Sequence, residues 1–411
     1  MRKRSLFLVM AVMPALADNC IDCHKKTTPR IVTDWQESKH SQNGIECSTC
    51  HGIEHSSASD VAKVKIPTPE TCEMCHAEQT AQFRASKHAA AWAAMKAMPT
   101  FHAQPVAMTE GMKGCGGCHK VGLKTPEEIK ELKASGAGFG LASCDACHTR
   151  HTFSTVEARQ PQACETCHMG FDHPQWEMYS ASKHGVRYLL KQTKTIPESA
   201  AAPTCQTCHM QQGNHAVITG WGFLAVRLPM PEDRQWAADR ATILKGLGVL
   251  DPDGKPTARL EVVKAAGVAR LTQEDWQRER DKMLEICRQC HSMNFAKEQL
   301  RRGDDMIRES DRLLAEAIET VAGLYKDGIL PKPKNYAFAY PDLLTFHDAP
   351  TPVEQRLFVM HLEHRMRAFQ GTFHGNPDYA LWYGWSEMRR DLTEIKSMAE
   401  ELRAKAKRAS R

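Results

Sequence analysis

The sequence predicts a mainly α-helical protein with two parts of different character. From about Glu232 onward, apolar residues recur at i, i+3, i+4 and i+7 beside charged faces, which is the pattern of amphipathic helices. Before that point, Gly, Pro, Ser and Thr are scattered along the chain, and the segments between them indicate short helices. The alternating pattern that predicts strands is nearly absent.

All 16 cysteines of the chain fall into eight C-x-x-C-H motifs. The cysteine pairs are Cys20 and Cys23, Cys47 and Cys50, Cys72 and Cys75, Cys115 and Cys118, Cys144 and Cys147, Cys164 and Cys167, Cys205 and Cys208, and Cys287 and Cys290. The histidines that complete the motifs are His24, His51, His76, His119, His148, His168, His209 and His291.

C-x-x-C-H is the attachment signature of c-type haem. The two thiols bind the vinyl groups of the porphyrin, and the adjacent His ligates the iron. Thioredoxin-like cysteine pairs and zinc knuckles are the alternatives, but neither requires a His after every second cysteine. The sequence therefore predicts eight covalently attached c-type haems, which we number in chain order, and a multihaem cytochrome c fold whose first part is packed around porphyrins.

The motifs are distributed unevenly along the chain. Seven lie between residues 20 and 209, and the eighth lies alone at 287–291. We expect a signal peptide at residues 1–17, a haem-dense domain at 18–231 with haems 1–7, and a helical domain at 232–411 with haem 8. The last domain should end in a helix bundle for oligomerisation, with its final helix running from about Tyr379 to the end.

The first residues have the features of a secretory signal, with the basic segment MRKR, the apolar run SLFLVMAVMP and the small residues ALA. We therefore expect a soluble, exported protein, periplasmic in a bacterium. The formal net charge of +5 falls when the basic segment is removed, and haem propionates lower it further. There is no Lys/Arg-rich run of the kind that binds a phosphate backbone, so a nucleic-acid partner is not expected.

Twelve of the 20 histidines lie outside the motifs and are candidates for the sixth iron ligand. A haem that only conducts electrons is usually six-coordinate, whereas a haem that reacts needs an open position. The candidates close to motifs in sequence are His40, His55, His88, His102, His151, His173 and His184. Three of them, His40, His88 and His184, are the last residue of the tripeptide SKH, which predicts a repeated ligand-bearing turn. Counting alone leaves open which haem lacks a sixth ligand.

The motifs and their intervals resemble the octahaem hydroxylamine oxidoreductase family, as do the stretches SASKHGVRY, GNHAVITGWGFLAVRLP and FHGNPDYALWYGW. The resemblance covers essentially the whole mature chain. It implies a homotrimer of mostly helical subunits, with bis-His haems that conduct electrons and a fourth haem that binds substrate. That haem would be attached here by Cys115 and Cys118 and ligated by His119.

The resemblance also implies roles around haem 4. In oxidising members of the family, a tyrosine near the C-terminus of a neighbouring subunit is bonded covalently to this haem, and Tyr379 and Tyr383 are the candidates here. Both could instead be packing residues at a helix contact. The family places an Asp-His pair in the distal pocket, and we expect Asn214 and His215 at that place, which leaves the carboxylate missing.

The resulting prediction is an oxidoreductase that oxidises hydroxylamine to nitric oxide or nitrite at haem 4, with His215 accepting protons. Electrons would pass through the other haems to a c-type cytochrome or a quinone-linked membrane cytochrome. The alternatives are reduction of nitrite or hydroxylamine to ammonium, oxidation of hydrazine, and pure electron transfer with every haem closed. The chain has no C-x-x-C-K motif, which argues against the commonest family of ammonium-forming nitrite reductases.

Overall fold

The computed structural model describes residues 17–96, 114–134, 143–222, 224–225, 228–265, 272–332, 339–345 and 348–411. Within these ranges the chain is helical, and the only extended pairing is an isolated antiparallel bridge between Leu250 and Pro256. The predicted mainly α-helical class is therefore confirmed. Residues 1–16 of the expected signal peptide and His102 lie outside the described ranges. No helix among the described residues is both long and apolar enough to cross a membrane.

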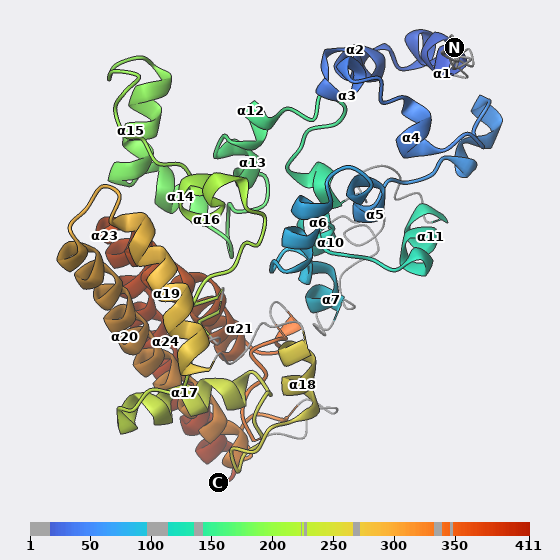
Figure 1. Cartoon of the computed structure of the whole chain (residues 1–411). Helices are drawn as coiled ribbons and strands as arrows, with labels where there is room; N and C mark the ends of the chain where they lie inside the picture. Colours follow the sequence, from blue (N-terminus) through green and yellow to red (C-terminus); the bar gives the residue numbers. More distant parts are fainter. Residues whose placement is uncertain are drawn as a thin grey trace, which may run out of the picture.

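The part of the chain that contains the first seven motifs consists of short helices joined by loops (Figure 1). Their bounds are α1 Ala17–Thr27, α2 Pro29–Glu37, α3 Lys39–Gln42, α4 Cys47–His51, η1 Ala58–Lys63, α5 Pro69–Glu73, α6 Ala77–Arg84, α7 Ala91–Lys96, α10 Cys115–His119, α11 Pro126–Ala134, η3 Ser143–Ala146, α12 Thr155–Ala158, α13 Gln162–Glu165, α14 Gln175–Ser180, α15 Lys183–Gln192, α16 Cys205–His209 and η4 Gln211–Gly213. Few apolar side chains are buried there, as expected of a region packed around porphyrins.

The C-terminal part is a bundle of longer helices (Figure 1). Their bounds are α17 Arg234–Gly246, α18 Ala258–Ala265, α19 Gln273–Cys287, α20 Met293–Lys326, α21 Pro352–Val359, the π-helix η6 Met360–His364, α22 Arg365–Phe373, α23 Pro377–Tyr379, the π-helix η7 Ala380–Trp385 and α24 Ser386–Ala409. The central helix α20 begins where the Ser292 side chain accepts a hydrogen bond from the Phe295 amide, and it ends before Gly328, whose φ is +67°.

The apolar stripe of α20 forms the core of the bundle. Leu313, Leu314, Ile318, Val321 and Leu324 are each fully buried in one cluster with residues of α17, α21 and α24. Full burial of each such side chain stabilises the fold by about 1.5–3 kcal/mol. The stripe of α24, with Met388 and Ile395, belongs to the same cluster, so at least this face of the predicted oligomerisation helix packs within its own chain.

The two π-helices occur where the sequence predicts uninterrupted α-helix. Gly384 in η7 lies against the backbone of α22, and a Cβ atom at this position would come within 2.4 Å of the Ala368 nitrogen. Only glycine allows so close an approach of the two helices. The wider π turn changes which residues face inward from this point on, which a regular 3.6-residue period cannot anticipate.

A buried ionic cluster joins three helices of the bundle around Asp311 of α20, which is fully buried. Its Oδ1 accepts hydrogen bonds from Nε and Nη2 of Arg365 in α22, at 3.1 and 2.6 Å. Its Oδ2 accepts from Nε1 of Trp236, at 2.8 Å, and from Nη1 of Arg240 in α17, at 3.2 Å. Arg365 also links the cluster to the loop before α17, because its Nη1 donates a hydrogen bond to the Leu224 carbonyl at 2.9 Å. The cluster therefore fixes the loop after the seventh motif to the bundle.

His361 in η6 should make the fold sensitive to acid. Its ring is fully buried, and neither ring nitrogen has a hydrogen-bond partner. Burial, helped by the charge of Arg365, lowers the pKa of His361 to about 3. Because the unfolded chain takes up a proton near pH 6.5 and the folded chain does not, stability falls as the pH drops below 6.5, by about 2 kcal/mol between pH 7 and pH 5.

The variant His361→Leu, with a side chain of similar volume, should remove this pH dependence. Urea unfolding of the two holoproteins at pH 7 and pH 5 measures it as a smaller pH-dependent difference in the variant. Equal differences in the two proteins would contradict the prediction.

Candidate haem-binding site

Three of the C-x-x-C-H motifs are single helical turns: α4, α10 and α16 each begin at the first cysteine and end at the histidine. Residues i, i+3 and i+4 of a helix share one face, so both thiols and the ring of each of these three motifs point to the same side. None of the 16 cysteines forms a disulfide. This arrangement fits two thioether bonds and one axial ligand to a single porphyrin.

Every motif histidine lies opposite a second histidine. The pairs are His24 with His55, His51 with His151, His76 with His40, His119 with His173, His148 with His215, His168 with His88, His209 with His374, and His291 with His184, with ring centroids 6.1 to 6.5 Å apart. Two imidazole nitrogens that share a metal at about 2 Å put their ring centroids about 6 Å apart. The spacing therefore fits one iron between each pair.

Hydrogen bonds to Nδ1 hold several motif rings in place. The Nδ1 partners are the Thr28 hydroxyl for His24 at 2.6 Å, the Lys65 carbonyl for His51 at 3.2 Å, the Ala91 carbonyl for His119 at 3.3 Å and the Gln175 side chain for His168 at 3.1 Å. With Nδ1 engaged, Nε2 is left as the nitrogen that binds a metal.

One continuous cavity of about 3700 Å³ runs through this part of the molecule. Cysteines and histidines of all eight motifs line it, together with all eight partner histidines. A cavity of this size bounded by ligating side chains matches a row of porphyrins, so the residues present fit the predicted cofactor.

The tripeptide SKH forms a ligand-bearing turn each time it occurs. Ser38 and Ser182 are buried N-caps whose hydroxyls accept hydrogen bonds from the amides three residues ahead, and the hydroxyl of Ser86 does the same. The histidine two residues after each serine, His40, His88 or His184, is one of the paired rings. The serine thus fixes the start of the turn that aims the ring.

The structure brings together most of the ligand candidates taken from the sequence. His40, His55, His88, His151 and His184 each lie beside one motif histidine. Two further partners were not among those candidates. His374 lies beside His209, and its Nδ1 is 2.8 Å from the Gln370 carbonyl in α22. His215, expected at the reacting haem, lies beside His148.

The expected distal pair Asn214 and His215 is therefore placed differently. The His215 ring lies 6.1 Å from the His148 ring, with an angle of 27° between their planes. The Asn214 side chain accepts a hydrogen bond from the Ala216 amide at 2.8 Å and so closes a local turn. This geometry fits a sixth ligand and its supporting turn rather than a proton-transfer pair.

Asp172 and His173 lie at His119 instead. The rings of His119 and His173 are 6.1 Å apart, and Nδ1 of His173 is 3.0 Å from Oδ1 of Asp172. His173 differs from the other partner rings because it also lies 6.0 Å from His168, which already faces His88. Burial raises the pKa of Asp172, but the hydrogen bond and charge of His173 outweigh it, and the pKa is lower than usual.

The sequence contains the signal for this pair, since FDH follows the sixth motif directly and holds both a carboxylate and an imidazole. His173 was assigned as a sixth ligand because it is near a motif, and Asp172 was not considered. The structure places both beside the fourth motif, which comes from a different stretch of the chain.

The two candidate tyrosines lie together on the C-terminal bundle. The rings of Tyr379 and Tyr383 are 5.0 Å apart, on α23 and η7. Tyr383 is 54% exposed and its neighbour Trp382 is 60% exposed, so this short segment presents aromatic side chains to the outside. Tyr379 is half-buried, and burial raises its pKa.

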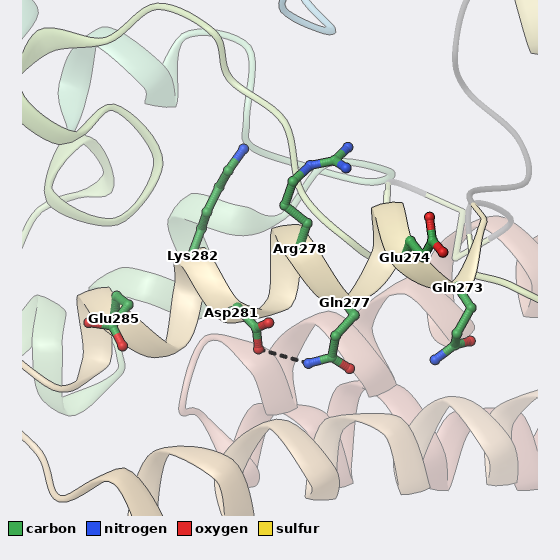
Figure 2. Close-up of a pocket in the computed structure, with 7 residues that line it drawn as sticks. All are labelled: Gln273, Glu274, Gln277, Arg278, Asp281, Lys282 and Glu285. Atoms are coloured by element: carbon green, nitrogen blue, oxygen red, sulfur yellow. Dashed lines mark hydrogen bonds between the residues drawn. The ribbon is translucent and has the colours of Figure 1, made fainter.

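A second hollow, of about 720 Å³, lies along α19 (Figure 2). Gln273, Gln277, Asp281 and Glu285 are among the side chains on this helix face, and Gln277 donates a hydrogen bond to Asp281 at 2.7 Å. All of its lining residues come from one helix and are polar or charged. It has the character of a solvated helix face rather than of a substrate site.

The short haem-binding helices, the paired rings and the shared cavity define a multihaem c-type cytochrome. The chain belongs to the multihaem cytochrome family described as "seven times multi-haem cytochrome CxxCH", which matches residues 17–227 and 258–336. The protein accordingly binds c-type haem covalently.

Two proteins of Kuenenia stuttgartiensis are similar to the chain. One is a probable nitrite reductase-hydroxylamine oxidoreductase fusion protein, 27% identical over 94% of this chain and 52% of its own length, so the chain spans about half of that relative. The other is a solved reducing HAO-like protein complex, with a TM-score of 0.71, 26% identity and coverage of 96% of this chain and 86% of its own. Together with the family match, these similarities confirm the resemblance to the hydroxylamine oxidoreductase family.

A solved structure described as a hypothetical multiheme protein shares the fold. Its TM-score is 0.69 at 20% identity, with 96% of each chain covered.

Proposed function

We propose that the protein is an octahaem oxidoreductase that oxidises hydroxylamine to nitric oxide or nitrite at haem 4. The observation that supports this most is the environment of His119. His119 faces His173, a ring that contacts Asp172 and also lies 6.0 Å from His168, whereas each of the other seven motif histidines faces a different ring of its own. In this proposal, the other seven pairs are bis-His haems that conduct, and the iron at His119 keeps a position for substrate.

The chain's own residues would handle the protons of the reaction. Oxidation of hydroxylamine to nitrite consumes one water and releases four electrons and five protons. Nδ1 of His173 is held by Asp172, so its Nε2 is the nitrogen that can accept a proton from the substrate, and Asp172 stabilises the imidazolium that results. A haem held by His119 would supply a Lewis-acidic iron that accepts electrons one at a time and passes them to the other haems.

Reduction to ammonium is the second candidate, because one solved neighbour is described as a reducing HAO-like complex. Hydroxylamine would then take up two electrons and three protons to give ammonium and water, and the same Asp-His pair would donate protons. Hydrazine oxidation differs only in the substrate, and a pure electron carrier would need His173 to close haem 4.

The spectrum of the purified holoprotein separates the enzymes from the carrier. We expect the resting protein to show one haem that is not bis-His beside seven low-spin haems, and added hydroxylamine to change only that component. Electron paramagnetic resonance and optical titration measure this. Eight low-spin haems that do not respond to hydroxylamine would overturn the proposed function in favour of electron transfer.

The tyrosines should decide the direction. Tyr383 is the more exposed of the two, so we propose it as the residue that reaches haem 4 of a neighbouring subunit. Digestion and mass spectrometry should then give a haem adduct of the tail peptide that is absent from Tyr383→Phe and retained in Tyr379→Phe. An unmodified tail peptide in the wild-type protein would instead support the reductase.

The remaining expectations belong to the same proposal. Residues 1–17 are a signal peptide, residues 18–231 a haem-dense domain and residues 232–411 a helical domain with haem 8. The mature protein is a periplasmic homotrimer that exchanges electrons with a c-type or quinone-linked cytochrome. The exposed aromatic segment at Trp382 and Tyr383 supports a subunit contact there.

A further inference from the structure

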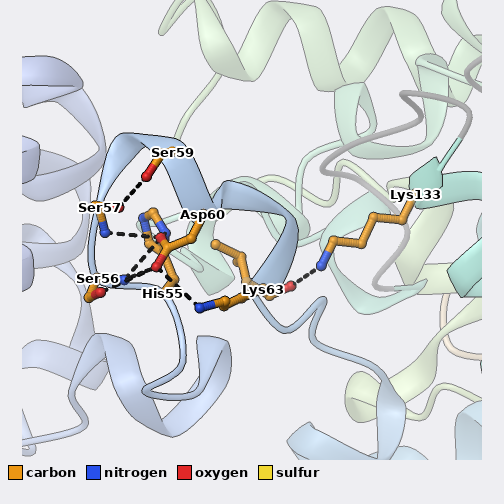
Figure 3. A network of polar contacts seen from close by, with 8 residues as sticks. His55, Ser56, Ser57, Ser59, Asp60, Lys63 and Lys133 are labelled. Atoms are coloured by element: carbon orange, nitrogen blue, oxygen red, sulfur yellow. Dashed lines mark hydrogen bonds and ion pairs between the residues drawn. The ribbon is translucent and has the colours of Figure 1, made fainter.

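A carboxylate is hydrogen bonded to the outer ring of the first histidine pair. Nδ1 of His55 lies 2.8 Å from Oδ1 of Asp60 (Figure 3). The backbone amide of Ser57 donates to the same oxygen at 2.9 Å, and the amide and hydroxyl of Ser56 donate to Asp60 at 3.2 to 3.3 Å. Lys63 Nζ lies 3.7 Å from Oδ2. Asp60 is thus fixed in one orientation at the start of η1.

The donors around Asp60 keep it ionised. The Ser56 and Ser57 amides and the His55 ring all contact its oxygens within hydrogen-bond distance, and such donors favour the charged form of a carboxyl group. The ring of His55 therefore shares its Nδ1 proton with a permanent anion. This is a carboxylate–histidine–metal arrangement in which the second ligand increases the basicity of the first.

The other conducting pairs have weaker partners at Nδ1 where a partner is recorded. His51 and His374 meet backbone carbonyls, and His168 meets an amide side chain. Asp172 also contacts an imidazole, but that ring faces the reacting position. Among the described conducting pairs, His24 and His55 thus have the only recorded carboxylate at an axial ring.

We propose that Asp60 lowers the reduction potential of haem 1 and makes it the low-potential end of the haem chain. A ferric iron with two imidazoles carries one more positive charge than the ferrous form. A fixed anion beside an axial ring stabilises the ferric form more, and a more basic ligand does the same. The proposal requires haem 1 to be ligated by His24 and His55, but it does not depend on the substrate or direction proposed above.

The position of haem 1 gives this potential a role. Its ligands lie on α1 and in the loop after α4, at the far end of the molecule from the C-terminal bundle (Figure 1). A terminal haem of low potential, once reduced, readily passes its electron to the neighbouring haems of higher potential. For the same reason, electrons that leave haem 4 during oxidation would not flow to haem 1. Haem 1 is therefore suited to admit electrons from a donor protein in the reducing direction.

Asp60→Asn tests the proposal by removing the charge while leaving an oxygen that can accept from His55. In a redox titration of the holoprotein followed at the haem α band, one of eight components should move to higher potential. At a fixed potential within its range, the ratio of reduced to oxidised haem 1 should rise about tenfold or more, which is a shift of about 59 mV per tenfold change.

Lys63→Gln should shift the potential of haem 1 in the opposite direction. The Lys63 side chain is 60% exposed, so its loss should not affect folding. Without this counter-charge, the same component should move to lower potential, and the ratio of reduced to oxidised haem 1 at a fixed potential should fall about two- to threefold. Glu54→Gln is the matched control, because it removes a negative charge from the exposed residue before His55 and should leave every component in place.

Unchanged titrations of Asp60→Asn and Lys63→Gln, or an equal shift in Glu54→Gln, would overturn the proposal. If Asp60→Asn loses haem during maturation, Lys63→Gln decides the outcome alone. None of these titrations needs substrate, so a failed turnover assay would count against the proposed reaction without affecting this result.

Discussion

Replacing Asp311 with alanine should reduce the free energy of unfolding by about 3–5 kcal/mol, because two buried arginines lose the anion between them. Arg240 and Arg365 are 3% and 1% exposed, and Asp311 accepts hydrogen bonds from both. Neither guanidinium can lose its proton at physiological pH, so the uncompensated charges remain in the protein interior. Urea unfolding of the holoprotein, followed by far-ultraviolet circular dichroism, measures the loss.

Asp305→Ala is the control for this variant, since it lies on the same helix and its pair with Arg301 is exposed to solvent. Its unfolding midpoint should stay close to that of the wild-type protein. A loss in Asp311→Ala no larger than in the control would mean that water reaches the cluster. Asp311→Asn should fall between the two, because it preserves the shape of the side chain but not its charge.

The haem attachment sites could be predicted from the sequence, because each depends on only five consecutive residues. The long helices α19, α20 and α24 could be predicted for a related reason, since their apolar stripes repeat with the helical period. The π-helices could not, because they depend on contacts such as the approach of Gly384 to Ala368. The sequence pattern thus predicts where the long helices lie, and contacts between helices decide where a π turn replaces an α turn.

The partner histidines divide in the same way. His40, His88 and His184 could be identified because each follows a serine that caps its own turn. His215 and His374 could not, because His215 follows η4 and His374 lies at the end of α22, and neither ring comes from a serine-capped turn. Closeness to a motif in the sequence therefore identifies a sixth-ligand histidine reliably only when a local turn also orients its ring.

That limitation also explains why His215 was expected at haem 4, whereas the structure places it beside His148. His215 lies close to the seventh motif, and Asn214 before it resembled a departure from an Asp-His pair. The structure removes the departure, since Asp172 supplies a carboxylate to the imidazole beside His119. In the proposed function, Asp172 takes the place of the carboxylate that the sequence expectation left missing.

Asp172→Asn should lower kcat/KM for hydroxylamine by about 10²–10⁴-fold, the usual contribution of a positioned acid–base group. The amide keeps one hydrogen-bonding oxygen but no longer stabilises a charged His173. His173→Gln should lower turnover to a similar extent. In both variants haem content and the low-spin components should match the wild-type protein, because the groups that are changed act on substrate and not as ligands of the conducting haems.

Two controls separate this role from sixth-ligand chemistry. Asn214→Ala changes only a turn beside His215 and should leave turnover within about twofold of the wild-type value, whereas the expectation from sequence makes it damaging. If His173 were instead an axial ligand, His173→Gln would create a new high-spin haem and increase access to the iron. Electron paramagnetic resonance of the resting variants distinguishes the two outcomes. A proton-transfer role for Asp172 and His173 requires slower turnover with an unchanged resting spectrum, because a group that acts on substrate is not needed to hold the iron.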